Sequence, residues 1–149
     1  MRPVTVLTAV SVVCCRESKT VAEKGYQMRK IAFDRAVRLS ERLIHLEKYL
    51  RYEAEEEYLA DQIAKYGSLI GDAVLHLESA YDQKEYTDGL KYGLMSVMKV
   101  RRWLKFLYEE NYLEDQTYKS LLRECDDLFN ILMRKSRRLF DELLGDMDL

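Results

Sequence analysis

The chain has 149 residues, of which 48% are hydrophobic and 34% charged, with one proline and six glycines. This length fits a single domain with a continuous core, and the mixture is that of amphipathic helices rather than of β-structure or a disordered chain. The formal net charge of -2 excludes a protein that binds nucleic acid by being basic as a whole, so such a role must rest on local patches. The three cysteines have neither disulfide nor metal-ligand spacing, which predicts a reducing, cytoplasmic location.

Residues 1–27 are predicted to form an N-terminal extension outside a bundle domain that spans residues 28–149. The extension contains the apolar run Val4–Cys15, which is too short to cross a membrane as a helix. We therefore expect no membrane association. A secretory signal is the alternative, but its basic region is minimal and no convincing small-x-small cleavage site follows the run.

Four amphipathic helices follow, each recognised by apolar residues that recur at steps of three and four. An acidic run, Glu53 to Glu57, suits the first turn of the second helix, where the macrodipole favours negative charge. A polar break from Glu109 to Asp115 separates the third helix from the fourth. The first helix is predicted from Gln27 to about Leu50, and the second from near residue 54 to the polar segment Asp82 to Lys84. The third carries the stripe from Tyr86 to Leu107, and the fourth follows the polar break.

The apolar stripes of these helices form the predicted core. Their members are Ala32, Ala36, Leu39, Leu43, Leu46, Leu50, Leu59, Ile63, Tyr66, Ile70, Val74, Leu77, Tyr81, Tyr86, Leu90, Leu94, Val97, Val100, Leu104, Leu107, Leu121, Cys125, Leu128, Leu132, Leu139 and Leu143. Short connections make an all-α, up-down-up-down antiparallel four-helix bundle the simplest way to bury all four stripes. Gly67, Gly71, Gly89 and Gly93 lie inside helices, where each costs about 1 kcal/mol relative to alanine, and they predict close helix approach.

No arrangement typical of an enzyme is found along the sequence. The two histidines, His45 and His76, fall on different helices, with no cysteine or serine placed as a nucleophile beside them. No Glu-x-x-His pair occurs that could hold a di-iron centre in a bundle. We therefore expect a protein that is not an enzyme and needs no cofactor or metal.

Local charge identifies the candidate binding residues. In an antiparallel bundle the end of the fourth helix lies beside the beginning of the first, so basic residues of both should meet there. A second group surrounds Trp103 on the third helix, and basic residues beside an aromatic ring suit a phosphate backbone and unstacked bases. The alternative is that these are solvated helix faces. The candidates are Arg35, Arg38, Arg134, Lys135, Arg137 and Arg138 in the first group and Lys99, Arg101, Arg102 and Lys105 in the second.

Tyrosines are numerous, and several fall near predicted helix ends: Tyr49, Tyr52, Tyr58, Tyr108 and Tyr112. Such amphipathic rings are enriched at protein interfaces, although any one of them can equally be an ordinary boundary residue. Together they favour a homo-oligomer.

From about Met28 to Leu139 the sequence resembles a superfamily of small bacterial four-helix-bundle proteins. It includes the 23S rRNA intervening-sequence proteins and the accessory variability determinants (Avd) of diversity-generating retroelements. The residues that carry the resemblance are Gln62-Ile63, Ile70-Gly71, the run Val100 to Leu107, Tyr112-Leu113, Tyr118 and Leu121-Leu122. The intervening-sequence branch has Asn and Glu where this chain has Ala73 and His76, and the run Arg102 to Leu107 is closer to the Avd branch.

The resemblance implies a homopentamer whose basic surface binds RNA or DNA and, in the Avd branch, a reverse transcriptase partner. Our first hypothesis is therefore a non-catalytic, oligomeric accessory protein that binds nucleic acid. The alternative is a structural protein–protein interaction module of the intervening-sequence type, with no direct nucleic-acid role.

Overall fold

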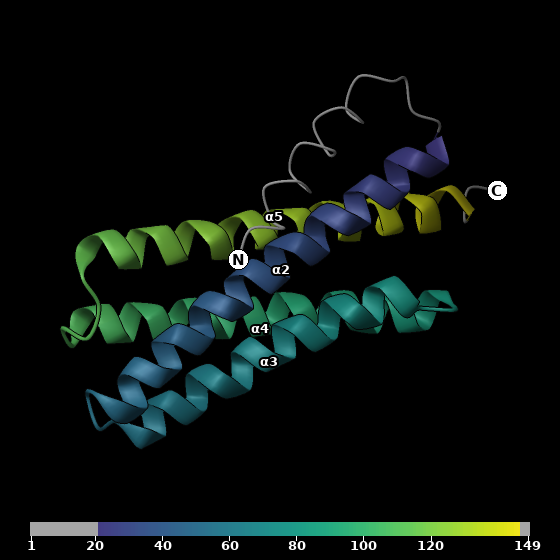
Figure 1. Ribbon diagram of the computed structural model, residues 1–149. Helices are drawn as coiled ribbons and strands as arrows, with labels where there is room; N and C mark the ends of the chain where they lie inside the picture. The colour runs from purple at the N-terminus through teal and green to yellow at the C-terminus, as the bar shows by residue number, and fades with distance from the viewer. Residues whose placement is uncertain (1–20, 147–149) are drawn as a thin grey trace, which may run out of the picture.

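The computed structural model describes residues 21–146, with side chains described from Lys30 to Gly145. It contains four helices, α2 (Val21–Tyr52), α3 (Glu57–Ser79), α4 (Gln83–Glu109) and α5 (Asp115–Asp146). Successive helices run in opposite directions and pack on one another, and α2 also packs on α5 to close the bundle (Figure 1). The predicted all-α antiparallel four-helix bundle is confirmed.

Two helix starts differ from the predictions. Helix α2 begins at Val21 rather than Gln27, because Ala22, Glu23 and Lys24 have high helix propensity and extend the helix ahead of its apolar stripe. Helix α3 begins at Glu57 rather than near residue 54, because Glu55 has a left-handed φ of 56°, which a helix cannot include. The proposed domain boundary after residue 27 thus falls within α2, and residues 1–20 lie outside the described residues. None of the described helices is long and apolar enough to span a membrane.

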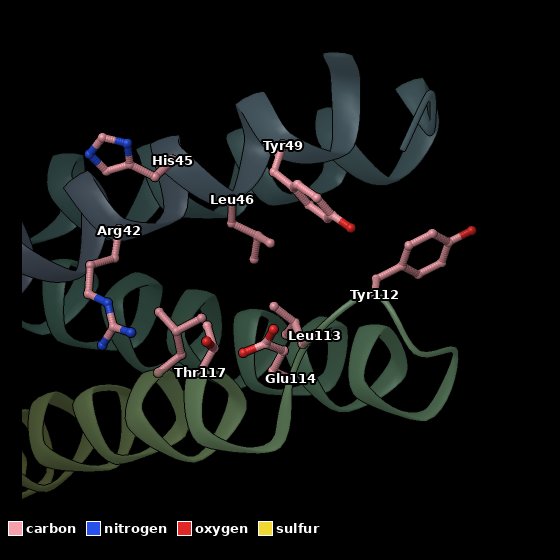
Figure 2. Close-up of a pocket in the computed structure, with 9 residues that line it drawn as sticks. Arg42, His45, Leu46, Tyr49, Tyr112, Leu113, Glu114 and Thr117 are labelled. Atoms are coloured by element: carbon pink, nitrogen blue, oxygen red, sulfur yellow. The ribbon is translucent and has the colours of Figure 1, made fainter. Parts of the chain in front are cut away.

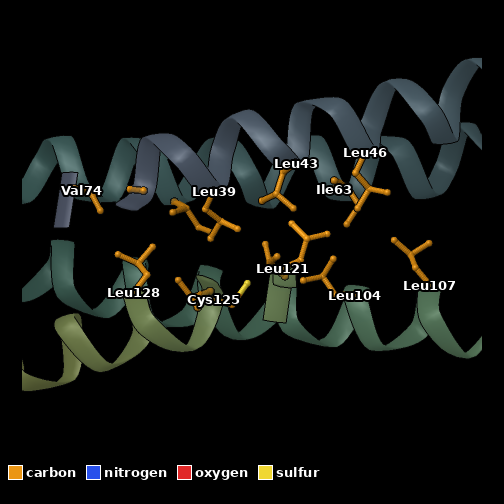
Figure 3. Packing of buried hydrophobic residues seen from close by; sticks show 14 of the residues in the cluster. Leu39, Leu43, Leu46, Ile63, Val74, Leu104, Leu107, Leu121, Cys125 and Leu128 are labelled. Carbon is orange, nitrogen blue, oxygen red and sulfur yellow. The ribbon is translucent and has the colours of Figure 1, made fainter. Parts of the chain in front are cut away.

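The core lies along the axis of the bundle and is built from the predicted stripes. Every predicted α2 position from Ala32 to Leu50 is buried, and Leu43, Ile63, Leu104 and Leu121 meet in its middle (Figure 3). The expectation for Tyr81 was wrong. Its side chain is 95% exposed, because α3 ends at Ser79 and the chain has already turned away from the core. Leu143, near the end of α5, is 39% exposed and also lies outside the core.

Three of the four helical glycines mark close helix approach. A Cβ atom built on Gly89 would lie 3.0 Å from Leu77 Cδ2, one on Gly93 3.2 Å from Leu132 Cδ1, and one on Gly67 3.3 Å from Leu43 Cδ1. These distances leave little room for a methyl group. Gly71 is the exception: its nearest neighbour would be a serine hydroxyl at 3.8 Å, an ordinary contact, so close packing there is not required.

Two of the tyrosines near helix ends hold the connection between α4 and α5 in place. The Tyr108 hydroxyl donates to Asp115 at 2.8 Å while its ring stacks on Tyr118, with centroids 4.3 Å apart. The Tyr112 hydroxyl donates to Glu56 and so ties this connection to the start of α3. These carboxylates stabilise the protonated phenols and raise the pKa of both Tyr108 and Tyr112. Both hydroxyl groups therefore make hydrogen bonds within the chain.

Candidate functional site

The basic residues of α2 face carboxylates of α5 along what we call the α2–α5 seam. Arg35 Nη1 lies 3.1 Å from Asp127 Oδ2, while Arg38 Nε and Arg42 Nη1 each lie 3.3 Å from Glu124 Oε1. Arg42 also donates to the hydroxyl of Ser120 at 2.7 Å. The predicted neighbourhood of the first and last helices is confirmed. However, Arg35 and Arg38 meet acidic residues there instead of adding to one positive patch.

The candidates on α5 lie beyond these ion pairs, toward the C-terminal end of the helix. Arg134, Arg137 and Arg138 are exposed. Lys135, predicted as a phosphate contact, is only 8% exposed and so offers a ligand far less surface than the three arginines. It continues the buried stripe of Leu128 and Leu132, where a lysine can cover the core with its aliphatic stem. We call Arg134, Arg137 and Arg138 the C-terminal basic cluster.

The four candidates around Trp103 on α4 do not share one environment. Arg101 pairs with Asp126 of α5 at 3.0 Å, and Lys105 makes a long, exposed contact of 3.9 Å with Glu109. Lys99 is half-buried and Arg102 is exposed, and neither makes an ion pair with any described residue. Of the second predicted group, Arg102 is thus the cation most available to a ligand.

Trp103 is half-buried and forms the base of an aromatic cluster that the sequence did not predict. Its indole packs edge-to-face against Tyr58 of α3, with centroids 6.1 Å apart, and against Phe106, with centroids 5.8 Å apart. Tyr58 is 66% and Phe106 41% exposed, so both rings are open to solvent. We call these three residues the aromatic platform. The antiparallel hairpin predicted for these two helices could have indicated this contact. It places the start of α3, which carries Tyr58, beside the end of α4, which carries Trp103.

A cleft of about 510 Å³ lies between α2 and the start of α5. Arg42 extends across it toward α5, and His45 lies on the α2 side, away from Thr117 and Glu114 (Figure 2). Its lining includes no cysteine, serine or lysine that could serve as a nucleophile.

Cys125 is the cysteine with a described environment, and it is fully buried in the core. Burial raises the pKa of its thiol to about 12, so the thiol stays protonated near neutral pH and is a poor nucleophile. Within residues 30–145, no cluster of histidine, cysteine or carboxylate side chains could hold a metal ion.

Comparison with known proteins gives one family and one fold. The family model of the 23S rRNA-intervening sequence protein matches residues 28–134. A crystal structure of a protein of unknown function from the S23 ribosomal protein family of Bacteroides thetaiotaomicron is similar, with a TM-score of 0.69 and 21% identity over 72% of this chain and 96% of that one. This structural likeness concerns the fold. No curated protein matches the chain.

Proposed function

This chain belongs to the 23S rRNA-intervening sequence protein family, and we propose that it is a non-catalytic, oligomeric accessory protein that binds nucleic acid. The observation that carries the proposal is the placement of exposed arginines that make no ion pair with any described carboxylate: Arg102 beside the aromatic platform, and Arg134 and Arg137 on α5. Phosphate contacts from such side chains supply most of the affinity in sequence-independent binding. The family name refers to an rRNA, so RNA is the first nucleic acid to test. A reverse transcriptase partner follows from the resemblance to Avd proteins and belongs to the same proposal.

Two pairs of substitutions test the nucleic-acid proposal. Replacing Arg102 and Lys105, or Arg134 and Arg137, by glutamine should weaken binding to a labelled RNA at about 50 mM salt, because each change removes phosphate contacts. Each lost contact should also flatten the slope of log affinity against log salt by about one unit. If both sites touch the same nucleic acid, the two losses should add.

Lys48→Gln is the matched control, since Lys48 is an exposed lysine of α2 outside both groups, and it should leave binding unchanged. Wild-type protein without measurable affinity for RNA or DNA at about 50 mM salt would overturn the nucleic-acid proposal.

A second candidate, a structural interaction module without a nucleic-acid role, is favoured by exposed apolar side chains on two sides of the bundle. On α2, Val37 is 40% and Ile44 49% exposed. Between α3 and α4, Leu69 and Tyr92 line a groove of about 340 Å³. The same candidate is favoured by the ion pairs of Arg35, Arg38 and Arg101 with carboxylates, because paired arginines are less available to phosphate.

Both candidates share self-association, which we propose takes the form of a homopentamer. A closed ring with head-to-tail contacts needs two different surfaces on each copy, and the apolar surfaces on α2 and on α3–α4 can serve as that pair. At about 20 µM, sedimentation should give a mass near 88 kDa, which is five times the 17.7 kDa of one chain. Val37→Glu combined with Ile44→Glu should yield a folded monomer, whereas Lys48→Gln should not change the mass. A wild-type monomer at that concentration would exclude the ring.

A further inference from the structure

Four side chains on one face of α4 combine positive charge with aromatic surface. Arg102 and Trp103 lie three and four positions after Lys99, and Phe106 lies four and three positions after them, so the four residues share that face. Tyr58 joins them from α3. Edge-to-face packing against Trp103 fixes the rings of Tyr58 and Phe106 in place while leaving them 66% and 41% exposed.

Fixed, exposed rings offer π-faces to planar groups, and every nucleobase has such a face once it is unstacked. In a duplex the bases are stacked on one another and present only their edges in the grooves. The aromatic platform can therefore contact a single strand in a way that it cannot contact a duplex.

The charges around the aromatic platform also favour a single strand over a duplex. Positive charge is limited there, because Arg101 is paired with Asp126 and Lys105 lies next to Glu109. On the α3 side, Tyr58 follows Glu57, whose side chain is 84% exposed. A duplex would bring two phosphate backbones toward these carboxylates. A single strand can lay one backbone along Lys99 and Arg102 and turn its bases toward the rings.

We infer that the aromatic platform, with Arg102 and Lys99, binds unstacked bases of single-stranded nucleic acid in preference to duplex. This inference rests on the proposed nucleic-acid function and specifies the form of its ligand. Only a few nucleotides fit against three rings, so each copy binds weakly. A ring of copies gains affinity because one strand can engage several of them at once.

Trp103 is the single tryptophan of the chain and reports directly on stacking. The experiment titrates the full-length protein with a mixed-sequence RNA of about 20 nucleotides and with its blunt duplex, at about 50 mM salt. Expected results are tighter binding of the single strand and quenching of Trp103 emission by that strand alone. Tyr58→Ala combined with Phe106→Ala should weaken single-strand binding by about 5-fold to 100-fold and leave duplex binding unchanged.

Tyr81→Ala is the matched control, because Tyr81 is a 95% exposed aromatic residue that lies outside the aromatic platform and outside both apolar surfaces. Equal binding of single strand and duplex without quenching would overturn this inference while leaving the nucleic-acid proposal standing. A loss of assembly in the Tyr58→Ala, Phe106→Ala variant, measured by sedimentation, would also overturn it, since the rings would then belong to an interface between copies. Absence of binding to either RNA would remove the proposed function and the inference together.

Discussion

Replacing Leu104 by alanine is expected to lower the free energy of unfolding by about 2–5 kcal/mol, which is a large fraction of the stability of a domain of this size. Leu104 is fully buried in the C-terminal half of α4 and belongs to the main hydrophobic cluster. The same cluster contains buried residues of the other three helices, among them Leu43 and Leu121 (Figure 3). Because backbone packing relaxes only partly, the truncated side chain leaves a cavity, and the cost of the cavity adds to the lost burial.

Leu144→Ala is the control for this change. Leu144 is 49% exposed near the end of α5, so its truncation should alter stability by no more than about 0.5 kcal/mol. Urea unfolding followed by circular dichroism gives both values. Similar midpoints for the two variants would show that Leu104 does not contribute to a packed core, contrary to the structure.

The helices and the core positions were predictable because both depend on local periodicity. Burial of Leu39, Leu43 and Leu50 follows from their spacing alone, since residues three and four apart share one face of a helix. Helix ends were less predictable. Tyr81 continued the stripe in sequence, but its position depends on the backbone at Ala80, whose extended conformation ends α3 first. Nothing in the periodicity encodes that turn.

The candidate site was predicted as a set of charges, and the structure shows which charges are used within the fold. The Arg35–Asp127 pair joins residues 92 positions apart. Whether an arginine on α2 meets a carboxylate or solvent depends on the rotation and register of α2 against α5, which core packing determines. The contact of Tyr58 with Trp103 has the same origin in the register of α3 against α4. The sequence identifies the charged and aromatic residues, but the packing of the helices determines which of them become partners.

Glu124→Gln is expected to lower the free energy of unfolding by about 1.5–3 kcal/mol, a range typical of hydrogen bonds that involve charged groups. The Glu124 side chain is only 13% exposed, and its Oε1 atom lies within 3.3 Å of both Arg38 and Arg42. Without the charge of Glu124, Arg38 and Arg42 lose the carboxylate that they share. The side chain of Arg42 is only 30% exposed, so solvent replaces this partner incompletely. Repulsion between the two arginines is then no longer offset. Thermal unfolding at neutral pH measures the loss.

The same substitution should increase nucleic-acid binding, because it makes Arg38 available to phosphate. Arg38 is 71% exposed at its side chain, so it needs no rearrangement of the core to reach a ligand. We expect tighter RNA binding at about 50 mM salt and a salt slope steeper by about one unit. Glu78→Gln, at an exposed position of α3, removes the same net charge elsewhere and should change stability by no more than about 0.5 kcal/mol and leave the slope unchanged. Equal slopes for wild type and Glu124→Gln would show that the nucleic acid does not reach the α2–α5 seam, and binding would then be confined to α4 and the C-terminal basic cluster.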